Sequence, residues 1–124
     1  MITKDYCGFE IAKLLKEKGF NELCFRLIRE DGEIVEAPSQ TWNGMTKEEK
    51  AQFYLCPTHQ MAMAWILEKY NVSIEVSALK RNYWVYTIYK ILYNKVKELY
   101  NDGEFKSHEK AVEAALKYSL EKLF

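Results

Sequence analysis

The side chains best suited to chemistry are a thiol and an imidazole at the start of one predicted helix. Cys56 and His59 occur in the order Cys-Pro-Thr-His. A thiol at a helix N-terminus beside an imidazole is biased toward the thiolate, so one hypothesis is a reactive cysteine. Redox motifs of this spacing carry a second cysteine at the position of His59, so the departure from them is large.

The same spacing is also compatible with half of a zinc site. Cys7, Cys24 or His108 would have to complete it, and these residues occur singly along the sequence. The third interpretation is structural: Cys56 is a small buried residue, as cysteine often is, and His59 is exposed or bonded to the backbone. We adopt the structural interpretation for both residues.

Groups for hydrolytic catalysis are scarce. The chain has two histidines and none of the G-x-S-x-G, Walker or G-x-G-x-x-G motifs. Most carboxylates occur at helical spacing with lysine, as in Glu113, Lys117 and Glu121, and suggest solvated helix faces. We therefore expect a non-enzymatic protein without catalytic residues, metal or cofactor.

Residues 80–97 combine positive charge with aromatic side chains and contain no acidic residue. The cations are Lys80, Arg81, Lys90, Lys95 and Lys97, and the aromatic residues are Tyr83, Trp84, Tyr86, Tyr89 and Tyr93. In a strand, one face would carry Tyr83, Val85, Thr87 and Tyr89, and the other Trp84, Tyr86 and Ile88. One set can be core, whereas the other needs a cover: a helix, a partner chain or stacked bases.

We expect an interaction surface in this stretch, with Trp84 or Tyr86 at its centre and Arg81 and Lys90 beside them. Aromatic residues and arginine are favoured at interface centres. Many of the acidic residues that balance the cations lie in residues 30–36. A partner of opposite sign, such as a second copy of the chain, would suit this asymmetry.

Length and composition indicate one ordinary globular domain, residues 1–124. There are 18 basic and 18 acidic residues, so global charge gives no argument for nucleic acid or an acidic membrane surface. The three widely spaced cysteines make a disulfide framework unexpected, and the start of the chain lacks the apolar segment of a secretory signal. We expect a soluble, cytoplasmic protein with no membrane association.

Residues 56–70 are predicted to form the helix on which the other elements pack. Thr58 is the expected N-cap, and Asn71 tolerates the left-handed conformation at the end. Residues 61–67 are all apolar. A helix that is apolar all round is usually buried on most faces, so Trp65 is expected in the core.

Other helices are predicted over residues 5–18, from Lys47 onward, and over residues 107–124. The expected N-caps are Thr3 or Asp5 for the first, Thr46 for the second and Ser107 for the last. Gly19 follows the first helix where a left-handed residue is expected.

A β-hairpin is predicted over residues 23–37, in one of two registers. A two-residue turn at Asp31-Gly32 would oppose Glu30 to Glu33. A three-residue loop that ends at Gly32 pairs Arg26 with Glu36 and Leu27 with Val35. Opposite charges and apolar residues then face each other, which favours the second register.

Further strands are predicted over residues 72–76 and 83–89. Residues 38–44 and 101–103 predict a loop and a turn, and residues 91–100 fit either a helix or a strand. The predicted fold is α+β, with an antiparallel sheet of four or five strands and three main helices. A helix–strand–strand unit that is duplicated and closed by the last helix is a further hypothesis.

Two segments, Pro-Thr-His-Gln-Met-Ala-Met-Ala-Trp at 57–65 and Glu-Lys-Ala-Val-Glu-Ala-Ala-Leu-Lys-Tyr at 109–118, resemble other proteins. They are similar to segments of small uncharacterised proteins of gut Bacteroidales bacteria and their phages or prophages. That family has no established activity, so the resemblance implies a phage-linked, cytoplasmic setting and assigns no functional residue.

The sequence thus favours a small interaction module that binds another protein or itself. One alternative is a weak single-stranded nucleic-acid binder through residues 80–97. A second alternative is a thiol-dependent enzyme that uses Cys56.

Overall fold

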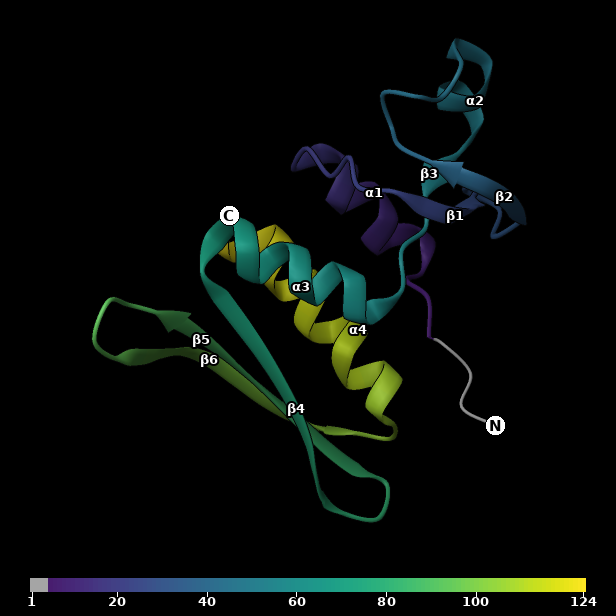
Figure 1. Ribbon diagram of the computed structural model, residues 1–124. Coiled ribbons are helices and arrows are strands. Elements are labelled where there is room, and N and C mark those ends of the chain that lie inside the picture. The colour runs from purple at the N-terminus through teal and green to yellow at the C-terminus, as the bar shows by residue number, and fades with distance from the viewer. Residues whose placement is uncertain (1–4) are drawn as a thin grey trace.

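Two three-stranded antiparallel sheets lie on opposite sides of a layer of helices in the computed structural model, which describes residues 5–124 (Figure 1). The helices are α1 (Phe9–Glu17), α2 (Lys47–Gln52), α3 (His59–Tyr70), α4 (His108–Tyr118) and a final π-helical turn, η1 (Ser119–Leu123). The strands are β1 (Cys24–Ile28), β2 (Ile34–Gln40), β3 (Tyr54–Leu55), β4 (Val72–Lys80), β5 (Tyr83–Ile91) and β6 (Val96–Phe105). The predicted α+β class is confirmed, but the predicted single sheet is wrong, because the strands divide between two sheets.

The hairpin of the first sheet has the predicted three-residue loop and register. Arg26 pairs with Glu36, and Leu27 pairs with Val35. Gly32 closes the loop with a φ of 88°, which glycine adopts without strain. The Arg26 guanidinium lies 2.6 Å from the Glu36 carboxylate, so the charge pair that favours this register is formed.

The other parts of the first sheet differ from the prediction. β2 continues through Pro38 to Gln40, where the sequence predicts a loop. Proline is tolerated there because the sheet order β2-β1-β3 makes β2 an edge strand. β3 is only two residues long, too short to show an alternating pattern.

α1 begins later than predicted. Its N-cap is Gly8 and not Asp5, while Thr3 lies outside the described residues. The end of α1 agrees with the prediction: Gly19 has a φ of 91°. The amides of Gly19 and Phe20 bond back to carbonyl groups of the last turn, as in a Schellman motif.

α3 has the predicted caps but is buried on one side only. The Thr58 hydroxyl accepts from the first turn, and Asn71 has a left-handed φ of 57°. Trp65 is buried at 8% exposure, whereas Ala64 is exposed and Leu67 is 41% exposed. The prediction of burial on most faces is therefore wrong, because a run of apolar residues does not establish burial when small or aliphatic residues can also face solvent.

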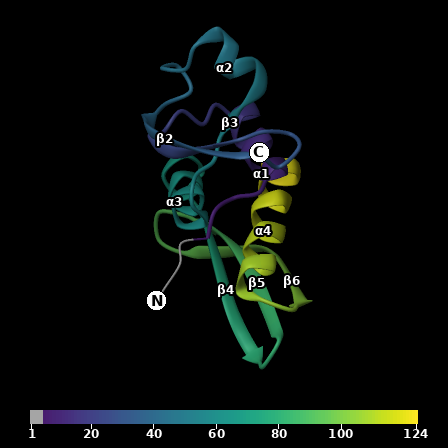
Figure 2. The ribbon, with the colours of Figure 1, turned by 90° about the vertical axis from the view of Figure 1, so that its right-hand side faces the viewer.

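α4 takes the central role that the sequence predicts for α3. It packs on all three strands of the second sheet and on α1 and α3. Ser107 caps it as predicted. Its inner stripe consists of Ala111, Val112, Ala115 and Leu116, all fully buried. Figure 2 shows α4 between the two sheets, and one hydrophobic core accordingly includes residues of both.

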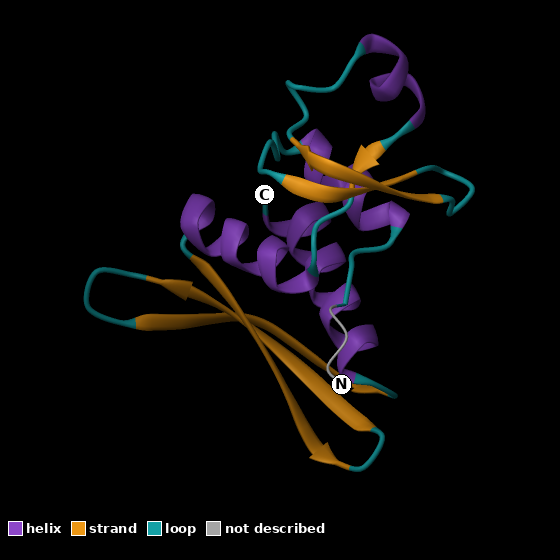
Figure 3. Ribbon diagram, turned by 45° about the vertical axis from the view of Figure 1, so that its right-hand side comes forward, coloured by secondary structure: helices purple, strands orange, loops and turns teal. Residues whose placement is uncertain are grey.

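The second sheet has the order β4-β5-β6. Residues 96–105 form β6, which decides the ambiguity over residues 91–100 in favour of a strand with a preceding turn. The predicted turn at 101–103 is wrong, because these residues lie within β6, where the register with β5 shifts between Trp84 and Tyr86. α3 and α4 lie on one face of this sheet (Figure 3).

The element order helix–strand–strand occurs twice, as α1-β1-β2 and α3-β4-β5. The third strands differ, because β3 joins β1 whereas β6 joins β5. Duplication stays a hypothesis, since the two units share their element order but not their central strand.

Candidate functional site

The thiol of Cys56 is enclosed next to the N-terminal segment. Cys56 is 1% exposed, and its Sγ donates to the carbonyl of Cys7 at 3.2 Å. Burial raises the pKa of the Cys56 thiol to about 11, although the nearby Arg26 guanidinium acts to lower it. A nucleophilic cysteine needs a lowered pKa, so this environment supports the structural interpretation and gives no support to a thiol-dependent enzyme.

His59 is held by a carboxylate from near the other end of the chain. Its Nε2 lies 3.1 Å from Oε1 of Glu113, and the same Oε1 accepts from the amide of Gly8 at 2.7 Å. The imidazole is buried, and its Nδ1 has no hydrogen-bond partner among residues 5–124. One carboxylate thus joins the N-cap of α1, the first turn of α3 and the middle of α4.

Two predictions about these residues are corrected. The sequence places Glu113 on the solvated face of the last helix, but its carboxylate bonds to His59 and Gly8. It also places His59 in an exposed or backbone-bonded position, but the ring is buried and bonded to a side chain. The only sequence signal for Glu113 is its position beside Val112 in the buried stripe of the helix.

A hollow of about 400 Å³ opens beside the His59–Glu113 pair. It is lined by Tyr6, His59, Phe105, Glu109, Lys110 and Glu113. On the His59 side of the hollow, Nε2 contacts Glu113 and Nδ1 is buried without a hydrogen-bond partner among residues 5–124. Within residues 5–124, no group of three or more His, Cys, Asp or Glu side chains gathers closely enough to hold a metal ion.

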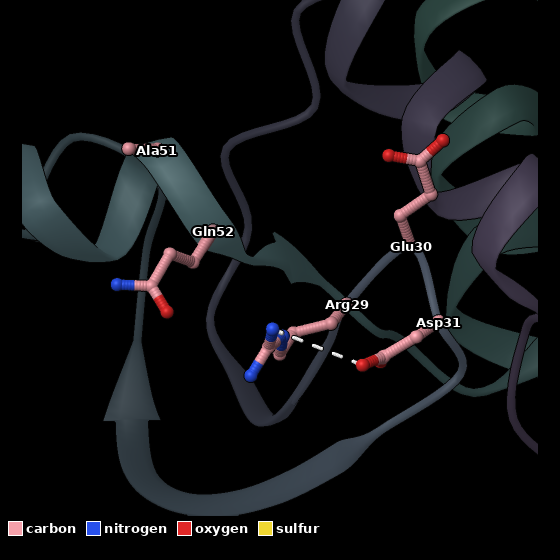
Figure 4. Close-up of a pocket in the computed structure, with 5 residues that line it drawn as sticks. All are labelled: Arg29, Glu30, Asp31, Ala51 and Gln52. Atoms are coloured by element: carbon pink, nitrogen blue, oxygen red, sulfur yellow. Dashed lines mark ion pairs between the residues drawn. The ribbon is translucent and has the colours of Figure 1, made fainter.

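A second hollow, of about 430 Å³, lies between the β1–β2 loop and α2. Figure 4 shows Arg29 and Asp31 directed toward each other and Glu30 directed away. The Arg29 guanidinium lies 3.8 Å from Asp31 and 2.9 Å from Glu33. Asp31, Glu33 and Glu36 are thus paired with arginines of their own hairpin, and the attraction of these acidic residues for a second copy stays a prediction.

Tyr86 belongs to the core and not to a surface. It is 2% exposed and lies on the helix-covered face, with its ring 5.7 Å from that of Phe105. Its predicted place in an interaction surface is therefore corrected, because a core side chain cannot contact a partner. Trp84 is half-buried on the same face, edge-on to His108 at 5.3 Å, and its role in binding stays a prediction.

The cations of residues 80–97 do not form one patch. Lys90 donates to the carbonyl of Tyr70 at 2.7 Å, at the C-terminal end of α3, where a cation is favourable. Arg81 is exposed in the β4–β5 turn. Lys95 and Lys97 lie at the opposite end of β5, about 30 Å away along a strand of this length.

The face of the second sheet turned away from the helices is not covered by any element of residues 5–124 (Figure 3). We call it the outer face. Its residues are Tyr83, Val85, Thr87 and Tyr89 on β5, with Ser73, Glu75 and Ser77 on β4 and Glu98 and Asn101 on β6. Of the two alternating sets in β5, the odd-numbered one is therefore the set that lacks a cover.

Gly103 makes room for this face. A Cβ at Gly103 would lie 2.7 Å from Cγ1 of Val85 and 3.9 Å from the Tyr83 hydroxyl. The absence of a side chain lets Val85 and Tyr83 lie over β6. On the outer face, the side chains of Val85 and Tyr83 thus pack over the backbone of β6 at Gly103.

The β5–β6 hairpin ends in a second exposed feature, which we call the tip, residues 91–97. The amide of Leu92 donates to the carbonyl of Lys95 at 2.8 Å and closes the turn. The exposed large apolar residues of the tip are Ile91, Leu92, Tyr93 and Val96. The tip therefore combines apolar side chains with Lys95 and Lys97.

Comparisons of the chain with protein-family models, with curated proteins and with solved structures return no match. The resemblance to Bacteroidales and phage proteins therefore stays a prediction, and no activity is carried over from a relative. Among residues 5–124, no helix is long and apolar enough to cross a bilayer.

Proposed function

We propose that the protein is a non-enzymatic interaction module that binds another protein through the outer face and the tip. The main support is the tip, the turn between β5 and β6. Its apolar side chains Ile91, Leu92, Tyr93 and Val96 are all exposed. Contiguous exposed apolar side chains with a polar rim are typical of protein interaction sites. The uncovered outer face extends this surface along β5.

The chemistry of the tip defines the kind of partner. Tyrosine is enriched at interface centres, whereas lysine is depleted there and belongs to the rim. Tyr93 would therefore enter an apolar hollow of the partner, and Lys95 and Lys97 would meet acidic residues around it. The three unpaired thiols suit a reducing compartment such as the cytoplasm.

The test compares proteins retained from an extract of the source cells by immobilised wild type, Tyr93→Ser and Phe25→Ser. Phe25 is 58% exposed on the first sheet, so it is a matched aromatic control remote from the tip. A partner retained by wild type and by Phe25→Ser but lost by Tyr93→Ser supports the proposal. Identical sets of proteins for all three contradict it.

A second candidate is single-stranded nucleic acid. It is favoured by Tyr83 and Tyr89 on the outer face, with cations at both ends of β5, because bases stack on aromatic side chains and phosphates attract cations. Glu75 and Glu98 on the same face and the formal net charge of zero count against it.

The two candidates are separated by fluorescence anisotropy with a labelled single-stranded oligonucleotide. An affinity that falls steeply with salt and is lost in Tyr89→Ala would favour nucleic acid. No binding at low salt would leave the protein partner as the better candidate.

A further inference from the structure

The edges of the two sheets are protected to different degrees. The orders β2-β1-β3 and β4-β5-β6 leave β2, β3, β4 and β6 at edges. Natural edge strands avoid pairing with other chains by being short, or by carrying proline, bulges or charges. β2 contains Pro38, and β3 has two residues. β6 has two register shifts against β5 and the charged residues Lys97, Glu98, Asp102 and Glu104.

β4 has these protective features mainly toward its C-terminal end, where its register with β5 shifts between Ala78 and Lys80. Its register with β5 is unbroken from Val72 to Ala78. It contains no proline, and Glu75 is the only charged residue between Val72 and Leu79. No strand within residues 5–124 pairs with its outer edge. β4 is therefore the edge most open to an added strand.

We propose that a second copy of the chain pairs with this edge, β4 against β4 and antiparallel, about a twofold axis through Val76. Val76 is the midpoint of the nine-residue strand. This register pairs the segment from Ile74 to Ala78, which has no register shift against β5, with the same segment of the other copy. A twofold axis perpendicular to the sheet keeps corresponding faces together. The two sheets then become one, with the helices of both copies on the same side.

The side chains are complementary in this register. On the helix-covered face, Ile74 lies opposite Ala78 of the other copy, and Val76 lies opposite itself. On the outer face, Glu75 lies opposite Ser77. An axis through Glu75 would oppose two carboxylates, and an axis through Ser77 would oppose Glu75 to Leu79, a charged residue to an apolar one. The Val76 register opposes Lys80 to Val72 only at the two ends of the strand pair, beyond the register shift between Ala78 and Lys80.

The contact is made by the backbone of the β4 edge, which is separate from the tip, and the inference does not depend on the proposed protein partner. Glu75 and Ser77 of this strand also belong to the outer face. The dimer leaves the outer face open and joins the outer faces of both copies into one. A partner with two binding surfaces would then bind with avidity.

The test is sedimentation velocity over a range of concentrations for wild type, Ser77→Lys and Ser77→Glu. Ser77 is exposed, so both variants should fold. Wild type is expected to form a dimer that dissociates on dilution. Ser77→Lys faces Glu75 of the other copy twice in the dimer and should lower the dimer dissociation constant roughly tenfold, whereas Ser77→Glu should raise it by a similar factor.

Asn101→Lys is the matched control, because Asn101 is exposed on the outer face of the other edge strand. It should leave the dissociation constant unchanged. A wild type that stays monomeric at all concentrations overturns the proposal. A dimer whose dissociation constant changes equally in Ser77→Lys and Ser77→Glu also overturns the proposal. If Tyr93→Ser abolishes the dimer, the contact between copies is at the tip and not at β4.

Discussion

The imidazole of His59 and the carboxylate of Glu113 lie 3.1 Å apart, although 54 positions separate them in the sequence. Because the same carboxylate oxygen also accepts from the amide of Gly8, it connects three helices. This contact links the N-cap of α1 to α3 and α4, while Nδ1 of the imidazole is buried without a partner among residues 5–124.

Replacing Glu113 tests this connection. Glu113→Ala removes both hydrogen bonds and leaves the buried imidazole of His59 without a partner, so unfolding free energy should fall by about 2 kcal/mol or more. Glu113→Gln keeps an acceptor oxygen and should recover most of the loss. Urea denaturation measures both, and equal losses for the two variants would contradict the role of the acceptor.

Trp65→Ala should lower the unfolding free energy by about 3–5 kcal/mol. The indole packs edge-on against Phe20 and Tyr70, at 5.3 and 5.9 Å between ring centroids. Leu67→Ala is the control on the exposed side of the same helix and should change stability by less than about 1 kcal/mol. Equal denaturation midpoints for the two variants would show that α3 does not anchor the core.

Cys56 should be unreactive in the folded protein. A thiol reagent at pH 8 should label it far more slowly than a free cysteine, because burial both covers the sulfur and keeps it protonated. Labelling should become rapid in urea, and Cys56→Ser should lose only the signal of this residue. Native labelling faster than that of a free thiol would revive the catalytic hypothesis.

Stability should fall at alkaline pH. Burial raises the pKa of Cys56 to about 11 and of Cys24 to about 12, and raises the pKa of Cys7 and Tyr86 as well. The folded protein keeps these protons longer than the unfolded chain, whose thiols titrate at about 8.5. Their contribution is therefore complete below about pH 8.5 and is lost as the pH rises toward the folded values.

Each such group adds a slope of up to about 1.4 kcal/mol per pH unit in this window. Urea midpoints measured from pH 7 to pH 10.5 should decline, and the decline should be shallower in Cys56→Ser. A midpoint that is constant over this range would contradict the burial of the thiols.

Gly103→Ala should destabilise the protein by about 1–3 kcal/mol, because the new methyl group would overlap Val85. The double variant Gly103→Ala/Val85→Ala should recover part of this loss. Additive losses in the double-mutant cycle, measured by denaturation, would show that the two residues are not coupled across β5 and β6.

The sequence by itself determined the local features of the fold. The Arg26–Glu36 register, the Thr58 cap, the left-handed Gly19 and Asn71, and the capping box at Thr46 are all present. Each depends on residues close together in the chain, so backbone preferences and neighbouring pairs decide them.

Only the tertiary structure decided which faces are buried. Alternation along β5 separates Tyr86 from Tyr89, but the position of α4 makes the first core and the second surface. The same holds for Glu113, whose partners come from two distant helices, and for the division of the strands into two sheets. These features depend on contacts between segments far apart in the sequence. The local order of apolar and polar residues does not indicate which distant segments will contact each other.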